Sequence, residues 1–156
     1  MKGFIATGLV LILGASPVWG QGTGEDVRRM VSVLNAIGVV VYYDSKECKR
    51  YNAYGMYLPT DRSLHVCNRG DRAEQLDTLR HEAWHVAQDY ADCKLGNNGF
   101  SPLARHTEIG KEYWDQTLSY PQGRRHMEAD AYQAAHRLST RQIADLLGMK
   151  YRACNR

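Results

Sequence analysis

The sequence predicts an α+β domain in which a long helix packs against a short antiparallel sheet. Three observations indicate this class. Apolar residues recur with the 3.6-residue period of a helix over residues 71–90. Two short runs, residues 54–58 and 63–67, have the alternation of strands and are joined by a sequence typical of a turn, Pro59-Thr60-Asp61-Arg62. Further helical patterns follow towards the C-terminus, without internal repeats.

The N-terminal residues 1–20 have the pattern of a secretory signal peptide. Lys2 precedes an apolar run from Phe4 to Leu13, and small residues follow it. We expect cleavage after Gly20, with a cut after Ala15 as the alternative. The run is shorter than the about 20 residues that a membrane-spanning helix needs. We therefore expect a secreted or periplasmic protein without a membrane anchor after signal removal.

Residues 21–156 are expected to form a single domain, because 136 residues suffice for one core but not for two. We also expect a monomer. Removal of Lys2 with the signal reduces the formal net charge from +3 to +2. The remaining charges are scattered, and no basic stripe alternates with aromatic residues. The sequence therefore gives no support for nucleic-acid binding.

All four cysteines lie in the mature chain, and an even number in an exported protein predicts two disulfides. Three pairings are possible. We expect Cys48–Cys67, which would clamp the β-region, and Cys93–Cys154, which would tie the C-terminus to the end of the long helix. The alternative is four free thiols in a reducing compartment. A structural zinc knuckle is not predicted, since no C-x-x-C pair occurs.

The first half of the mature chain reads as a helix followed by strands. Residues 25–37 have a helical period that ends at Gly38. Val39–Tyr43 is β-branched and aromatic, which predicts a buried strand. The runs 54–58 and 63–67 then form a hairpin at the edge of the sheet, with His65 on its surface.

The long helix has clear start and packing signals. Asp71 is a good N-cap, and Glu74 completes a capping box. On a helix, His81 and His85 lie one turn apart, opposite an apolar stripe. That stripe consists of Leu76, Leu79, Ala83, Val86, Ala87 and Tyr90. The helix can therefore pack into a core on one side and present two imidazoles to a cleft on the other.

The C-terminal part is predicted to contain a loop and three helical segments. Residues 94–102 are rich in Gly, Asn and Pro, which is typical of a loop. Helical segments are expected over residues 103–118 and 124–137. The last helix is Thr140–Leu147, with Thr140 as N-cap and Gly148 as its end.

Residues 81–85, His-Glu-Ala-Trp-His, match the H-E-x-x-H pattern. At this motif the sequence resembles the zincin group of zinc metallopeptidases. The resemblance implies a zincin-like fold, one Zn²⁺ per chain, and a hydrolase acting on peptide or protein substrates. His81 and His85 would bind the metal, and Glu82 would be the general base that activates the attacking water. It also implies that an edge strand within residues 54–67 binds extended peptide by main-chain pairing.

A catalytic zinc ion takes three protein ligands, so one more is needed. Glu128-Ala129-Asp130 resembles the string that supplies a glutamate ligand in gluzincins. We choose Glu128, because it shares a helix face with small and apolar residues that could approach the motif helix: Ala131, Tyr132 and Ala135. His126 is the alternative. Its face has the polar pattern of a solvated surface: Asp130, Gln133 and Arg137.

The sequence alone does not select the residues that would orient the metal ligands or stabilise the transition state. Asp130 and Asp89 are candidates to orient a ligating imidazole. Five residues are candidates to stabilise the oxyanion of the transition state: Tyr113, Tyr120, Tyr132, His106 and His136.

Two other functional classes also stay open. One is a zinc-binding, non-proteolytic module of the same fold that binds peptide or cell-wall components. The presence of Glu82 argues against it, since binding alone needs no base at that position. The other is a disulfide-stapled structural or inhibitor domain in which the H-E-x-x-H pattern is accidental.

Overall fold

The computed structural model describes residues 24–96 and 100–156, so the expected signal peptide lies outside the described residues. The described residues form six α-helices, three strands and two 3₁₀ turns. In chain order these are α1 (Gly24–Ile37), β1 (Val40–Tyr43), α2 (Lys46–Tyr51), β2 (Gly55–Leu58), β3 (Ser63–Val66), α3 (Arg72–Asp89), η1 (His106–Glu108), α4 (Lys111–Gln116), η2 (Gln122–Arg124), α5 (Arg125–Arg137) and α6 (Thr140–Cys154).

The α+β class is confirmed, but the sheet is mixed and not antiparallel. Its strand order is β1-β3-β2. The hairpin of β2 and β3 is antiparallel as expected, whereas β1 runs parallel to β3. The reason is topological: the chain leaves β1 through α2, reaches the far edge as β2, and returns through the middle as β3 in the direction of β1.

The expectation of a buried strand at residues 39–43 was wrong for most of its length. Val39 is fully buried, but it precedes the strand, and Val40, Tyr42 and Tyr43 are about half exposed. β1 is an edge strand, so β3 covers one side of it while the other side stays open. A β-branched and aromatic run is equally typical of either position.

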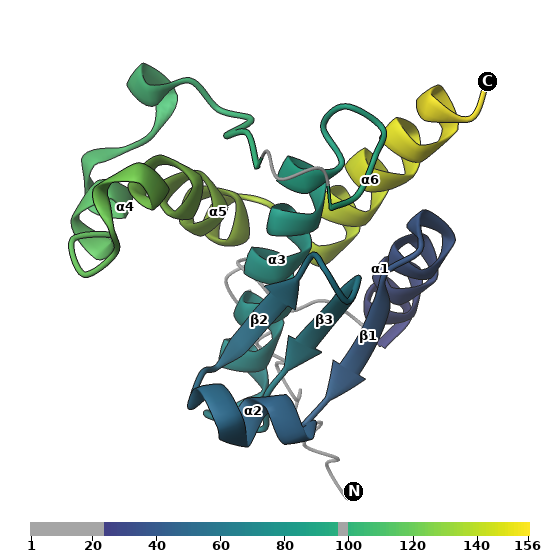
Figure 1. The fold of residues 1–156 in the computed structure, drawn as a ribbon, viewed down its shortest axis with the longest axis horizontal. Helices are drawn as coiled ribbons and strands as arrows, with labels where there is room; N and C mark the ends of the chain where they lie inside the picture. The colour runs from purple at the N-terminus through teal and green to yellow at the C-terminus, as the bar shows by residue number, and fades with distance from the viewer. Residues whose placement is uncertain (1–23, 97–99) are drawn as a thin grey trace, which may run out of the picture.

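Helix α3 is the central element of the fold. It packs against β2 and β3 on one side and against α5 and α6 on others. Figure 1 shows α4 and α5 on one flank of α3, beyond β2, and α1 and α6 on the other. The main core lies between α1, the sheet, α3 and α6, and its fully buried members include Met30, Leu34, Leu64, Ala83, Val86 and Ile143.

The helix expected over residues 103–118 was wrong in extent: the structure has η1 and the short α4 instead. Side chains from α5 hold the backbone of this stretch, and one of them takes an N–H group that a continuous helix would use, that of Gly110. Asp130 accepts hydrogen bonds from the backbone N–H groups of Leu103 and Ala104, at 2.8 and 3.3 Å. The Gly110 N–H donates to Gln133 Oε1 at 2.9 Å.

The last helix is longer than predicted. Ser139, not Thr140, is the N-cap, and its side chain forms a capping box with Gln142. The helix continues through Gly148 to Cys154. A Cβ atom at Gly148 would lie 3.7 Å from Val33 on α1, so this glycine lies at a close helix contact and does not end the helix. Helix α2 was not predicted, because its six residues have no apolar period.

Both expected disulfides are present. Cys48–Cys67 joins α2 to the residue after β3, and Cys93–Cys154 joins the segment after α3 to the end of α6. Two disulfides are typical of proteins in oxidising compartments. Within residues 24–96 and 100–156, no helix has the length and apolar character needed to cross a bilayer.

Candidate metal centre

The start of α3 fixes the orientation of the motif residues. The Asp71 carboxylate accepts hydrogen bonds from the N–H groups of Ala73 and Glu74, at 2.8 and 3.0 Å. The Glu74 carboxylate in turn accepts from the Asp71 N–H at 2.7 Å, which completes the predicted capping box. Apolar side chains of the helix then enter the main core, and the two histidines face α5.

His81, His85 and Glu128 come together as the sequence predicted. The Nε2 atoms of the two imidazoles lie 3.1 Å apart, and each lies 3.3 Å from Oε2 of Glu128. The three groups come from two helices and are 47 residues apart in sequence at most. Among the described residues they form the one cluster of three or more histidine, cysteine or carboxylate side chains arranged to hold a metal ion.

The three separations fit a tetrahedral zinc ion. Zinc binds imidazole nitrogen at about 2.0–2.1 Å and carboxylate oxygen at about 2.0–2.2 Å, which places two ligand atoms of a tetrahedron about 3.3 Å apart. The triangle of 3.1, 3.3 and 3.3 Å has the size of one face of that tetrahedron. Three ligands leave the fourth position for water or substrate.

Glu128 is held in place as a ligand through one of its oxygens. The carboxylate is 2% exposed, and Oε1 accepts a hydrogen bond from the Arg124 guanidinium at 2.9 Å, which leaves Oε2 for the histidines. Burial alone would raise the pKa of Glu128, but the hydrogen bonds of His81 and His85 hold it well below its usual range. The carboxylate is therefore ionised, which favours a cation between the three groups.

His126, the alternative ligand, does not join the cluster. Its Nε2 lies 3.1 Å from the Ala104 carbonyl oxygen, and its ring packs against Trp114. We expected this face of α5 to be solvated, but Asp130 on the same face is 2% exposed. The segment between α3 and α4 covers that face, which the polar pattern of α5 alone did not indicate.

Gln88 orients the imidazole of His85, a role that sequence reasoning missed. The Gln88 amide nitrogen donates to Asp130 Oδ2 at 2.8 Å and to the Met127 carbonyl at 3.0 Å. Its amide oxygen must therefore accept from Nδ1–H of His85, at 2.8 Å. This leaves the Nε2 lone pair of His85 for the metal. The signal in the sequence is the position of Gln88, three residues after His85 on one helix face.

The two aspartates proposed to orient an imidazole directly have other hydrogen-bond partners. Asp130 acts on His85 through Gln88 and not directly. Asp89 accepts hydrogen bonds from the Tyr57 hydroxyl at 2.7 Å and from the Gly96 N–H at 2.9 Å, so it ties α3 to β2 and to the following loop. Among the described residues, neither aspartate hydrogen-bonds to an imidazole of the cluster.

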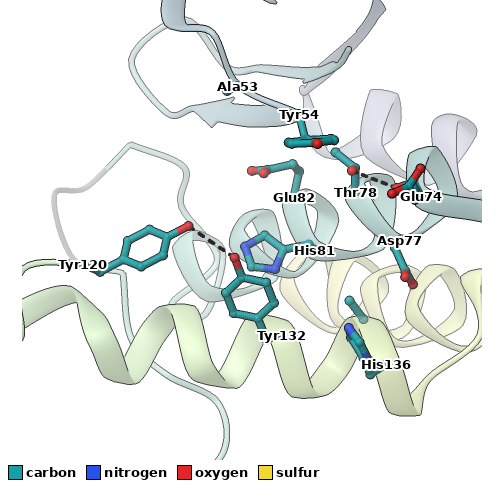
Figure 2. A pocket seen from close by; sticks show the side chains of 12 residues that line it. Ala53, Tyr54, Glu74, Asp77, Thr78, His81, Glu82, Tyr120, Tyr132 and His136 are labelled. Atoms are coloured by element: carbon teal, nitrogen blue, oxygen red, sulfur yellow. Dashed lines mark hydrogen bonds between the residues drawn. The ribbon is translucent and has the colours of Figure 1, made fainter. Parts of the chain in front are cut away.

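Glu82 lies at the centre of a cleft. Two pockets of about 460 and 530 Å³ meet at four shared lining residues: Gly55, His81, Glu82 and Tyr120. The Glu82 side chain is 9% exposed and makes no hydrogen bond or ion pair with another described residue. Figure 2 shows its carboxylate between Tyr54 and His81, in position to accept a proton from a molecule in the cleft.

The structure narrows the candidates for oxyanion stabilisation. Tyr120 and Tyr132 line the cleft with hydroxyl oxygens 3.4 Å apart, and the Tyr132 ring packs on His81 (Figure 2). Burial and the hydrogen bond with Tyr132 raise the pKa of Tyr120 well above its usual value, so its hydroxyl stays protonated. His136 also lines the cleft. Two candidates lie elsewhere, beside Trp114 or Arg137: His106 and Tyr113.

The prediction that His65 lies on the surface was wrong. Its side chain is 4% exposed, with Nδ1 2.7 Å from Ser45 Oγ and Nε2 2.9 Å from Ser63 Oγ. Helix α2 covers the face of β3 that the strand alternation predicted to be open. Because α2 was not predicted, the burial of His65 was not either.

Comparisons of this chain with protein-family models, with curated proteins and with solved structures give no significant match.

Proposed function

We propose that the chain is a zinc-dependent metallopeptidase of the zincin type that hydrolyses peptide bonds. One observation carries the proposal: the triangle of His81, His85 and Glu128 has the dimensions of a three-ligand zinc site, with the unpartnered carboxylate of Glu82 next to it in a cleft. A site that only binds metal needs no carboxylate at that position.

The residues of the chain have separate roles in this mechanism. A zinc ion bound by the three ligands would lower the pKa of a water molecule and polarise the substrate carbonyl. Glu82 would accept the proton of the attacking water and return it to the leaving amine. Tyr120 or Tyr132 donates a hydrogen bond to the oxygen on which negative charge develops.

The position of β2 supports a peptide as the substrate. β2 is an edge strand of the described sheet, and Gly55, Met56 and Tyr57 line the cleft beside Glu82. The unpaired side of an edge strand can take up an extended peptide by main-chain hydrogen bonds. An extended peptide placed there would pass Glu82 and the metal ligands.

We further propose that the enzyme acts after export. The expected signal peptide over residues 1–20 and the two disulfides agree on an oxidising compartment outside the cytoplasm.

The test is turnover of a library of internally quenched peptides by zinc-loaded protein of residues 21–156. We expect cleavage that a chelator abolishes and added zinc restores. Glu82→Gln should keep the zinc and lose at least about 10²-fold in kcat/KM, because the general base is gone. Glu47→Gln, on α2, is the matched control. A wild type that binds zinc but cleaves nothing, or a Glu82→Gln variant with full activity, would contradict the proposal.

A further inference from the structure

The two halves of the cleft differ in charge. One half lies towards the start of α3, and we call it the acidic half. Among the described residues, three carboxylates and no lysine or arginine line it. The carboxylates are Glu74, Asp77 and Glu82. The other half, which we call the apolar half, shares Glu82 and contains the ion pair of Arg124 with Glu128. The rest of its lining includes side chains without charge: Met56, Pro59, Phe100 and Met127.

The carboxylates of the acidic half carry more negative charge than their neighbours neutralise. Glu82 is 9% exposed and unpartnered among the described residues. Glu74 accepts a hydrogen bond from a backbone N–H, which leaves its charge in place. Asp77 forms an ion pair with Arg80 on its own helix, through Oδ1. A positive group that enters this half would meet two carboxylates without a cationic partner.

Aromatic rings line the same half. They belong to Tyr54 from the segment before β2, Tyr120 before η2, and Tyr132 on α5. Figure 2 shows these rings around the space next to His81 and Glu82. Aromatic faces attract guanidinium and ammonium groups, and carboxylates form charge-assisted hydrogen bonds with them. The combination favours a cationic side chain over a neutral or acidic one.

The apolar half also has aromatic rings, but beyond the shared Glu82 it has no carboxylate without a cationic partner among the described residues. Apart from Glu82, its one described carboxylate is Glu128, which is paired with Arg124 at 2.9 Å and belongs to the candidate metal centre. The side chains of Met56 and Phe100 favour an apolar group in this half. The residues shared by the two halves include Glu82 and His81, beside which a bond would be cleaved. The charge difference therefore lies across the scissile bond.

We propose that the acidic half of the cleft is a subsite for an arginine or lysine side chain of the substrate. The inference rests on the proposed peptidase function and adds its substrate class: peptides with a basic residue on one side of the cleaved bond and an apolar residue on the other.

The test uses peptides that keep one phenylalanine fixed and vary the neighbouring residue among arginine, lysine, norleucine and glutamate, on either side. For zinc-loaded wild type we expect kcat/KM to fall in that order, with arginine and lysine preferred on one side only. Glu74→Gln should reduce the ratio of arginine to norleucine about fivefold, since a partly exposed charge is lost while the capping box is kept. Glu25→Gln, also in the first turn of a helix, is the matched control and should leave the ratio unchanged.

Calorimetry gives a second measurement that does not depend on turnover. Binding is measured with zinc-loaded wild type and Glu74→Gln, both of which keep Glu82, and with analogues of the same peptides in which an uncharged group that cannot be hydrolysed replaces the scissile amide. Tighter binding of the arginine peptide supports the subsite if it depends on Glu74. If wild type shows this binding but cleaves nothing, the subsite stands and only the proposed peptidase function fails. Cleavage without a basic preference, together with equal affinities, would overturn the subsite and leave the peptidase intact. Absence of both cleavage and selective binding would overturn both.

Discussion

The amide of Gln88 links a metal ligand to the interior of the protein. It is fully buried and connects His85 to Asp130, which in turn holds the loop at Leu103. We predict that Gln88→Met lowers zinc affinity about 10–100-fold, because His85 loses the acceptor that fixes its tautomer and ring orientation. Competition with a chromophoric chelator measures this. Gln116→Met, at the exposed end of α4, is the control, and equal affinities in the two variants would contradict the role of Gln88.

Gly55 lets β2 approach α3 at Glu82, the proposed general base. A Cβ atom there would lie 2.3 Å from Thr78 Cγ2, 2.9 Å from the His65 carbonyl oxygen and 3.2 Å from Glu82 Cγ. We predict that Gly55→Ala lowers the free energy of unfolding by about 1–3 kcal/mol and reduces turnover by displacing Glu82. Urea unfolding and peptide cleavage measure the two effects.

The matched control for this substitution is Gly123→Ala, because a Cβ atom at Gly123 would meet nothing within 4 Å. If Gly55→Ala were as stable and active as Gly123→Ala, the close approach of β2 to Glu82 would be wrong.

At the residue scale, the sequence predicted the site residues that the periodicity of a single helix indicates. The i, i+4 histidines and Glu82 follow from one helical motif, and Glu128 follows from the face that carries Ala131 and Ala135. Gln88 was missed because its partners are 39 and 42 residues away, in a helix whose packing the sequence does not give.

At the scale of elements, His65 connects strand β3 to helix α2 through Ser45. Burial lowers the pKa of His65, although the charges of Glu47 and Asp61 oppose the effect. The neutral imidazole is therefore the native form. A histidine whose folded pKa is depressed stabilises the fold above its unfolded pKa of about 6.5, and this stability is lost as the pH falls through the folded pKa.

We therefore predict that wild type loses stability relative to His65→Gln as the pH is lowered from 7.5 to 5. The glutamine does not titrate, and histidines elsewhere contribute equally to both proteins. Urea unfolding of the two proteins at each pH measures the difference in free energy. A difference that stays constant over this range would show that His65 titrates alike in the folded and unfolded states.

Elements were predicted well where local signals define both ends. The capping box at Asp71 and the stop at Gly38 gave α3 and α1 within a residue or two. The stretch over 103–118 was predicted wrongly, because Asp130 and Gln133 of another helix hold its backbone. Gly148 was misread as a stop because its use in the α1–α6 contact is not visible in a single sequence.

At the scale of the whole molecule, the disulfides close loops of different size around the candidate metal centre. Cys93–Cys154 encloses α4 and α5, which includes Glu128, with a sequence separation of 61, whereas Cys48–Cys67 has a separation of 19. In the chain-entropy account, the longer loop contributes about 4 kcal/mol and the shorter about 3 kcal/mol. Both pairings were predicted, but the parallel β1–β3 pairing was not, because strand direction depends on the crossover and not on local pattern.

We predict that the pair of substitutions Cys93→Ser and Cys154→Ser destabilises the protein more than Cys48→Ser and Cys67→Ser. Loss of the Cys93–Cys154 disulfide should also weaken zinc binding, since α6, which directly follows the helix that carries Glu128, is no longer tied to the segment after α3. Unfolding in urea and zinc titration of both variants test this. Equal destabilisation and unchanged zinc affinity would contradict it.

The central claim is that His81, His85 and Glu128 form one zinc site, and metal content tests it most directly. Residues 21–156 are purified as wild type, Glu128→Ala and His126→Ala, and zinc is measured by mass spectrometry after dialysis. We predict about one zinc ion per chain in wild type and in His126→Ala, and loss of zinc in Glu128→Ala, since a three-ligand site requires each ligand. A wild type that binds no zinc after refolding with excess metal would contradict the site. Retention in Glu128→Ala with loss in His126→Ala would contradict the assignment of its third ligand.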